Sequence, residues 1–97
     1  MAERPRTAVV HYNGLPYTRD LSMCRRALTH RQVEGKFLGG MADLATESGC
    51  HRSVVSRFFA GLNVSTEMTM RILGSLELDF DQVHKPVPPS DASDGDG

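Results

Sequence analysis

The stretch Leu44–Gly61, LATESGCHRSVVSRFFAG, decides the fold of this chain. It predicts two short helices joined by a tight turn. The first helix is the run Met41–Ser48, with Leu44 and Ala45 facing inward. Gly49 suits the turn, because a left-handed backbone conformation penalises a residue that carries a Cβ. Two helices joined in this way form a helix-turn-helix, whose second helix can enter the major groove of DNA.

The second helix is expected to begin at His51 or the residue beside it, and it has two different faces. Its apolar residues recur at helical spacing and predict a buried stripe of Val54, Val55, Phe58 and Phe59. The polar residues outside this stripe are Arg52, Ser53, Ser56 and Arg57. Arginine can pair with guanine O6 and N7, and serine hydroxyls can donate to bases or phosphates. An ordinary solvated face is the alternative interpretation of these four residues.

The same stretch resembles the Cro/C1-type (XRE-like) repressor family, over about residues 38–83. That family has a Leu-Ala pair, three variable positions, a Gly, a recognition helix with serines beside β-branched residues, and a second Gly. The matching positions here are Leu44-Ala45, Gly49, Ser53-Val54-Val55-Ser56 and Gly61, and the family's next helix looks like Val64-Ser65-Thr66 and Arg71–Leu76. Met41 stands where the family often has a Gln, and His51 stands where a Ser or Gly cap is common.

The resemblance implies a mainly α fold: a lambda-repressor-like bundle of four to five helices with a helix-turn-helix, preceded here by a short N-terminal β-strand or hairpin. It also implies that Arg52, near the start of the recognition helix, faces the base edges. The candidate DNA-binding residues are Met41, His51, Arg52, Ser53, Ser56, Arg57 and Asn63.

The N-terminal part predicts a hairpin. Thr7–Tyr12 reads as a strand and is followed by Asn13-Gly14, the strongest short hairpin signal, with Leu15–Tyr17 as the return strand. Pro16 cannot donate to a ladder, so it belongs at a sheet edge. An isolated hairpin is marginal, so this one needs a partner, either the helical body or a second copy of the chain.

A first helix is expected from near Arg19 to about Glu34, capped by Thr18 or Asp20. Its buried face consists of Leu21, Cys24 and Leu28. After the motif, a helix is expected to begin after Ser65 and to bury Met68, Ile72 and Leu76. Asp79 is expected to cap a last short helix. The expected organisation is an arm and hairpin in residues 1–17, a DNA-binding domain in 18–84, and a disordered acidic tail in 85–97.

The net charge of −1 hides an asymmetry. Residues 1–36 carry seven Lys or Arg and three acidic residues, whereas residues 79–97 carry one Lys and five acidic residues. A basic front half is compatible with polyanion binding. The chain has no run of about 18 apolar residues and no charged-then-apolar leader, which predicts neither a membrane span nor secretion. We expect a reduced, cytoplasmic protein, because the two cysteines lack metal-type spacing.

Cys50 beside His51 raises the hypothesis of a small enzyme. Consecutive helical residues point about 100° apart, so the thiol and the imidazole would be poorly aligned. Adding Cys24 and His30 matches no common zinc spacing. The sequence therefore predicts no enzyme, no metal and no cofactor, with Cys50 packed as a small apolar residue.

These features predict a sequence-specific, double-stranded-DNA-binding transcriptional regulator, a repressor that acts as a homodimer on a palindromic operator with half-sites about 34 Å apart. The dimer surface is either the Thr7–Tyr17 hairpin, slightly favoured, or the Leu76–Val83 end. The alternative is an antitoxin-like autoregulator whose arm or acidic tail, Asp91–Gly97, also binds a protein partner. Arginines outside the motif have either a DNA-steering or a plain surface role: Arg4 and Arg6 in the arm, and Arg25, Arg26 and Arg31 on the first helix.

Overall fold

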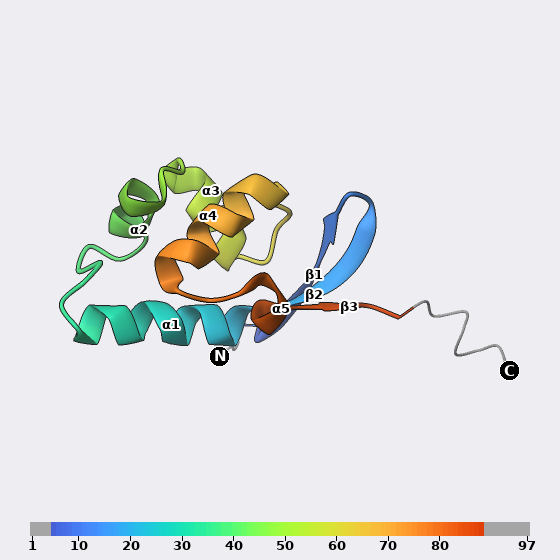
Figure 1. The fold of residues 1–97 in the computed structure, drawn as a ribbon, viewed down its shortest axis with the longest axis horizontal. Coiled ribbons are helices and arrows are strands. Elements are labelled where there is room, and N and C mark those ends of the chain that lie inside the picture. The colour runs from blue at the N-terminus through green and yellow to red at the C-terminus, as the bar shows by residue number, and fades with distance from the viewer. Residues whose placement is uncertain (1–4, 89–97) are drawn as a thin grey trace, which may run out of the picture.

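The computed structural model describes residues 5–88. In this range the chain forms three strands and five helices (Figure 1). The strands are β1 (Thr7–Tyr12), β2 (Leu15–Asp20) and β3 (His84–Pro86). The helices are α1 (Leu21–Val33), α2 (Met41–Ser48), α3 (Arg52–Phe59), α4 (Thr66–Leu76) and α5 (Phe80–Val83).

The prediction of a mainly α bundle is wrong, because the described chain is an α+β protein. Its three strands form one antiparallel sheet in the order β1-β2-β3. After α5 the chain turns back along β2, so that Arg19 faces His84 and Tyr17 faces Pro86. The expected hairpin is therefore part of a sheet that joins both ends of the described chain, and not an appendage in front of a helical bundle. Figure 1 shows this sheet at one end of the helical layer.

The hairpin turn itself is confirmed. Asn13 and Gly14 both have positive φ, 55° and 79°, as a two-residue turn between twisted strands requires. The expectation that Pro16 lies in an edge strand is wrong, since β2 is the central strand. Pro16 is accommodated because it lies at the end of the β2–β3 ladder, where its carbonyl still accepts from the Val87 N–H at 3.1 Å.

Side-chain caps set the helix starts, and α1 begins at Leu21 and not near Arg19, because β2 continues from Leu15 to Asp20. The Asp20 carboxylate accepts from the Met23 N–H at the start of α1, and the Ser65 hydroxyl accepts from the Met68 N–H at the start of α4. Asp79 and Gln82 form a capping box at α5. These bonds satisfy N–H groups that a helix leaves unpaired at its start.

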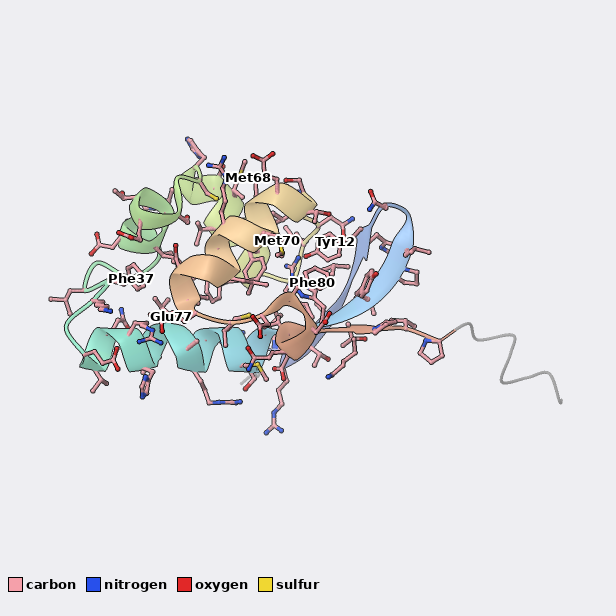
Figure 2. All side chains as sticks on the ribbon, in the orientation of Figure 1. Tyr12, Phe37, Met68, Met70, Glu77 and Phe80 are labelled. Carbon is pink, nitrogen blue, oxygen red and sulfur yellow. The ribbon has the colours of Figure 1, made fainter. Side chains whose placement is uncertain are left out.

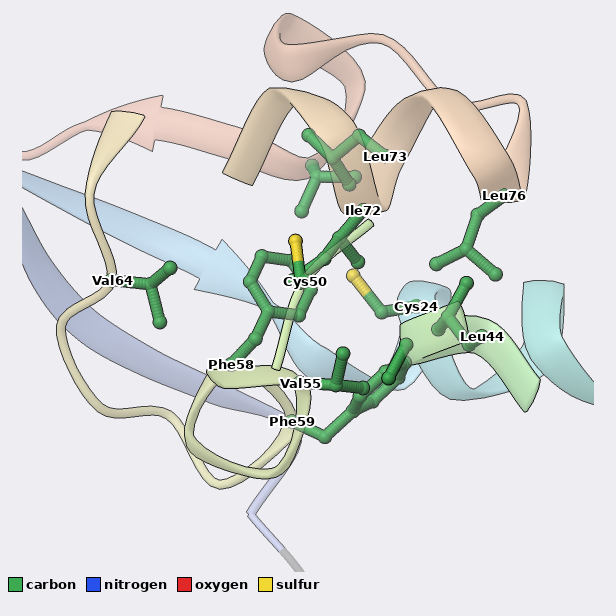
Figure 3. Packing of buried hydrophobic residues seen from close by; sticks show 12 residues of the cluster. Cys24, Leu44, Cys50, Val55, Phe58, Phe59, Val64, Ile72, Leu73 and Leu76 are labelled. Carbon is green, nitrogen blue, oxygen red and sulfur yellow. The ribbon is translucent and has the colours of Figure 1, made fainter. Parts of the chain in front are cut away.

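One apolar core lies between α1 and the other helices (Figure 3). The helix-turn-helix contributes its inward residues Leu44, Ala45, Val55, Phe58 and Phe59, and α4 contributes Ile72, Leu73 and Leu76. At the sheet end, Tyr12 and Phe80 lie close together, with their rings 5.3 Å apart and edge to face (Figure 2). The core therefore fixes α3 from one side only, and leaves its other side to the solvent.

Candidate nucleic-acid interface

The turn between α2 and α3 has the predicted geometry. Gly49 ends α2 in the left-handed region, at φ 75° and ψ 21°. The Cys50 N–H donates to the Ala45 carbonyl at 3.1 Å, which closes the helix end. A Cβ on Gly49 would lie 3.2 Å from Nη1 of Arg71, the end of a long and partly exposed side chain that can move aside. The left-handed backbone conformation therefore favours glycine at this position.

The two faces of α3 separate as predicted. Val55 and Phe58 are fully buried, and Phe59 is 6% exposed. Val54 is half-buried and lies at the margin of the stripe. The four polar residues Arg52, Ser53, Ser56 and Arg57 are all exposed. The side chains that would contact DNA are therefore not covered by the rest of the described chain.

His51 caps α3. Its Nδ1 accepts from the Ser53 backbone N–H at 3.1 Å and lies 2.9 Å from the Ser53 hydroxyl. A ring nitrogen that accepts an N–H carries no proton, so the neutral ring carries its proton on Nε2. This arrangement fixes the ring at the start of α3 and leaves an Nε2–H donor free of these two contacts.

Arg57, in the last turn of α3, contacts Asn63 in the loop that follows α3. Nη2 of Arg57 donates to the Asn63 carbonyl at 3.2 Å, and Oδ1 of Asn63 accepts from the His11 N–H at 2.9 Å. Asn63 therefore holds the loop after α3 against β1. Arg52 differs, since within residues 5–88 its side chain has neither a hydrogen-bonding partner nor an ion pair, which leaves its full donor set available.

Met41 lies beside the same surface. It lines a shallow hollow of about 310 Å³ together with Ser56, and the rest of the lining is Pro5, Arg25, Phe59 and Ala60. Nη2 of Arg25 donates to the Pro5 carbonyl at 2.8 Å, which holds the start of the described chain here. Arg25 therefore borders the candidate surface, although it is not among the seven candidate DNA-binding residues predicted from the sequence. Helical spacing places it on the outer face of α1, but only the packing of α1 against α3 shows that it borders Ser56.

The other arginines of α1 have different roles. Nη1 of Arg26 donates to the Ser22 hydroxyl at 2.6 Å. Arg31 pairs with Glu34 at 2.6 Å and with Glu77 at 3.0 Å, and its side chain is only 17% exposed. Arg31 therefore ties the end of α1 to the end of α4. Of the three, Arg25 alone borders the hollow beside α3.

The cysteines are buried apart from the exposed face of α3. Cys50 is 8% exposed, and its sulfur lies 3.4 Å from the Met68 sulfur. Cys24 is fully buried, and this burial raises the pKa of its thiol to about 12. In the part of the chain that the structure describes, no three His, Cys, Asp or Glu side chains are grouped as a metal site.

Two predicted features lie outside the described residues: Arg4 of the arm and the acidic tail Asp91–Gly97. Arg6 is described, and its carbonyl accepts from the Leu21 and Ser22 N–H groups at 2.8 and 3.1 Å, which fixes it at the start of α1. Among residues 5–88, no helix has both the length and the apolar character that crossing a bilayer requires. Comparisons with family models, curated proteins and solved structures find no match to this chain.

Proposed function

We propose that this chain is a sequence-specific, double-stranded-DNA-binding transcriptional regulator of the Cro/C1 (XRE-like) type, with α3 as its recognition helix. One observation carries the proposal: α3 buries its apolar stripe and exposes all four of its predicted polar residues. A helix of eight residues is about 12 Å long, close to the width of the major groove. The turn that precedes α3 supports the same assignment.

The exposed groups suit different parts of a duplex. Arg52, at the first position of α3 and without a protein partner within the described chain, is assigned to a base edge. Ser53 and Ser56 offer hydroxyls to bases or phosphates. Arg57 is already bonded to the Asn63 carbonyl, so it is assigned to the sugar–phosphate backbone. His51 and Arg25 extend this surface at the start of α3 and beside Ser56.

We propose that two copies act as a homodimer on a palindromic operator, and that they associate on the DNA. The outer edge of β1 is partly closed, because the His11 N–H already donates to Asn63. On the other edge, the His84 N–H donates to the Phe80 carbonyl, and Pro86 has no N–H. Strand addition is therefore disfavoured at both edges. The Leu76–Val83 end is not available as a dimer surface at these two residues, because Leu76 and Val83 are each only 1% exposed.

Selection of binding sites from random duplex DNA tests the function. We expect enrichment of a palindrome whose half-sites are one helical turn apart, with binding that occludes a promoter as the simplest mechanism of repression. Sedimentation should then find single chains without DNA and two chains on the enriched duplex. Absence of any enriched sequence would contradict the proposal.

The second candidate is the antitoxin-like autoregulator, which uses the same α3 surface and adds a protein partner. A hollow of about 630 Å³ lies away from α3, between the loop before α2 and the end of α4 (Figure 2 labels Phe37 and Glu77, which line it). This hollow supports a second contact surface. Pull-down with and without residues 89–97 separates the candidates, because only the autoregulator should lose a partner when the tail is removed. We place either protein in the cytoplasm, where the free thiols of Cys24 and Cys50 stay reduced.

A further inference from the structure

Arg19 is a fully buried arginine in the central strand β2. Its Nη1 donates to two carbonyls at the end of the recognition helix, those of Phe58 at 2.8 Å and Leu62 at 3.0 Å. Its Nη2 donates to the Tyr12 hydroxyl at 2.7 Å, and its Nε donates to Nε2 of His84 at 3.3 Å. The guanidinium thus joins all three strands to α3 and to the loop that leaves it.

The charge of Arg19 is offset by α3. No carboxylate forms an ion pair with Arg19 among residues 5–88. Instead, the guanidinium carbon lies 4.1 Å from the centre of the Phe58 ring, and Nη1 faces the carbonyl end of the helix, where the helix dipole is negative. Burying a cation is costly unless its geometry is well satisfied, so the position of the α3 end and the position of Arg19 depend on each other.

The loop after α3 also contacts β1 at two further points, Asn63 and Gly61. Asn63 accepts from the His11 N–H. Gly61 has φ 83°, and a Cβ on it would lie 2.6 Å from the Ala8 Cβ, so the loop passes the Ala8 methyl group with room for glycine only. The hydrogen bonds at Leu62 and Asn63, together with the close approach at Gly61, therefore place residues 61–63 against the sheet. Because Arg57 bonds to the Asn63 carbonyl, this loop also sets the direction of the Arg57 side chain.

We propose that Arg19 is a positioning residue for DNA recognition, and that the hairpin supports the recognition helix and does not serve as a dimerisation arm. Arg19 holds the end of α3 and residues 61–63 in place, and through the Asn63 carbonyl this sets the direction of Arg57, the side chain assigned to the sugar–phosphate backbone. This inference rests on the proposed function. Its structural half, the restraint of the loop, is testable without DNA.

The first experiment compares the full chain with Arg19→Lys. Lysine keeps the charge, but a single ammonium cannot reach Phe58, Leu62 and Tyr12 in the geometry of the guanidinium fork. We expect the amides of Gly61 and Leu62 to exchange with deuterium at least ~10-fold faster, and the Kd for the enriched duplex to rise at least ~10-fold. Both are measured under conditions in which unfolding curves show more than ~95% native protein.

The matched control is Leu76→Ala, which removes buried apolar groups at the end of α4, beside Met23 and Ala27 of α1 and outside the Arg19 hydrogen bonds. It lowers global stability without touching the restraint, so its Kd should stay within about 2-fold of the wild-type value. If it weakens DNA binding as much as Arg19→Lys does, Arg19 acts through stability alone and the proposal is overturned.

A second variant covers the case in which Arg19→Lys does not fold. His11→Pro removes the N–H that binds Asn63, at a strand position whose N–H points away from the β1–β2 ladder. Faster exchange at residues 61–62 together with about 3-fold weaker DNA binding supports the positioning role. A looser loop with unchanged Kd overturns it. If the wild-type chain enriches no duplex, the proposed function fails, while the exchange data still decide whether the sheet restrains the loop.

Discussion

Nε of Arg19 donates to Nε2 of His84 at 3.3 Å, in the interior of the protein. The other ring nitrogen, Nδ1, lies 3.3 Å from the Phe80 carbonyl, so the neutral ring carries its proton there and accepts on Nε2. His84 is 2% exposed. Burial, reinforced by the Arg19 cation, lowers the pKa of His84 from 6.5 to about 4. The neutral ring is therefore part of the network that holds the sheet to α3.

The lowered pKa of His84 predicts that the protein loses stability in mild acid. The unfolded chain binds a proton at His84 below pH 6.5, whereas the folded chain stays neutral down to about pH 4. The unfolded state binds more protons in this window, so stability is fully present above pH 6.5 and falls as the pH falls. We expect a loss of about 2 kcal/mol between pH 7 and pH 5, measured by urea unfolding.

The control for this prediction is His84→Gln, which can still accept from Arg19 but does not titrate in this range. Its stability should change much less between the same two pH values, although its absolute stability is lower. An equal slope in both proteins would mean that another group causes the acid sensitivity.

Arg52→Ala should weaken binding to the enriched duplex by about 1–3 kcal/mol and relax the preference at one base position. Arg52 is exposed, so the unfolding midpoint should hardly change. Gel mobility on the operator and on single base-pair variants measures both effects. If affinity for random DNA falls equally, Arg52 contacts a phosphate and does not read a base.

Arg25 and Arg26 are neighbours in sequence and form a matched pair. Only Arg25 lines the hollow that contains Ser56, whereas Arg26 bonds to Ser22 within its own helix. We expect Arg25→Ala to lower the magnitude of the logarithmic salt slope of DNA binding by about 0.9, as the loss of one phosphate contact does. Arg26→Ala should leave the slope unchanged. Equal slopes in the two variants would remove Arg25 from the interface.

The sequence predicted the features of this protein that local chemistry determines. The Asn13-Gly14 turn, the caps at Asp20 and Ser65, and the left-handed Gly49 all depend on residues a few positions apart. The separation of α3 into two faces follows from helical periodicity alone.

The features that the sequence does not predict depend on long-range packing. β3 is three residues long and ends in Pro86, so it forms only because β2 offers a partner more than sixty residues away. Arg19 was expected at the start of a helix. Nothing beside it in the sequence indicates burial, because its partners come from α3, the following loop, β1 and β3. For Arg25, Arg26 and Arg31 the sequence left a DNA-steering and a plain surface role open, and only the packing of α1 against α3 singles out Arg25.

The close approach of Gly61 to Ala8 gives the last prediction. In Gly61→Ala, the new Cβ would lie 2.6 Å from the Ala8 Cβ and 3.3 Å from Cδ1 of Leu21, on a backbone with φ 83°. Strain and overlap together should lower the free energy of unfolding by about 2–4 kcal/mol. Ala8→Gly removes the nearer methyl group, so the double variant should recover part of the loss and leave about 1–2 kcal/mol of backbone strain. Urea unfolding of the four proteins gives the coupling energy directly. Additive losses would show that the loop after α3 does not press on β1, and that it can move without the sheet.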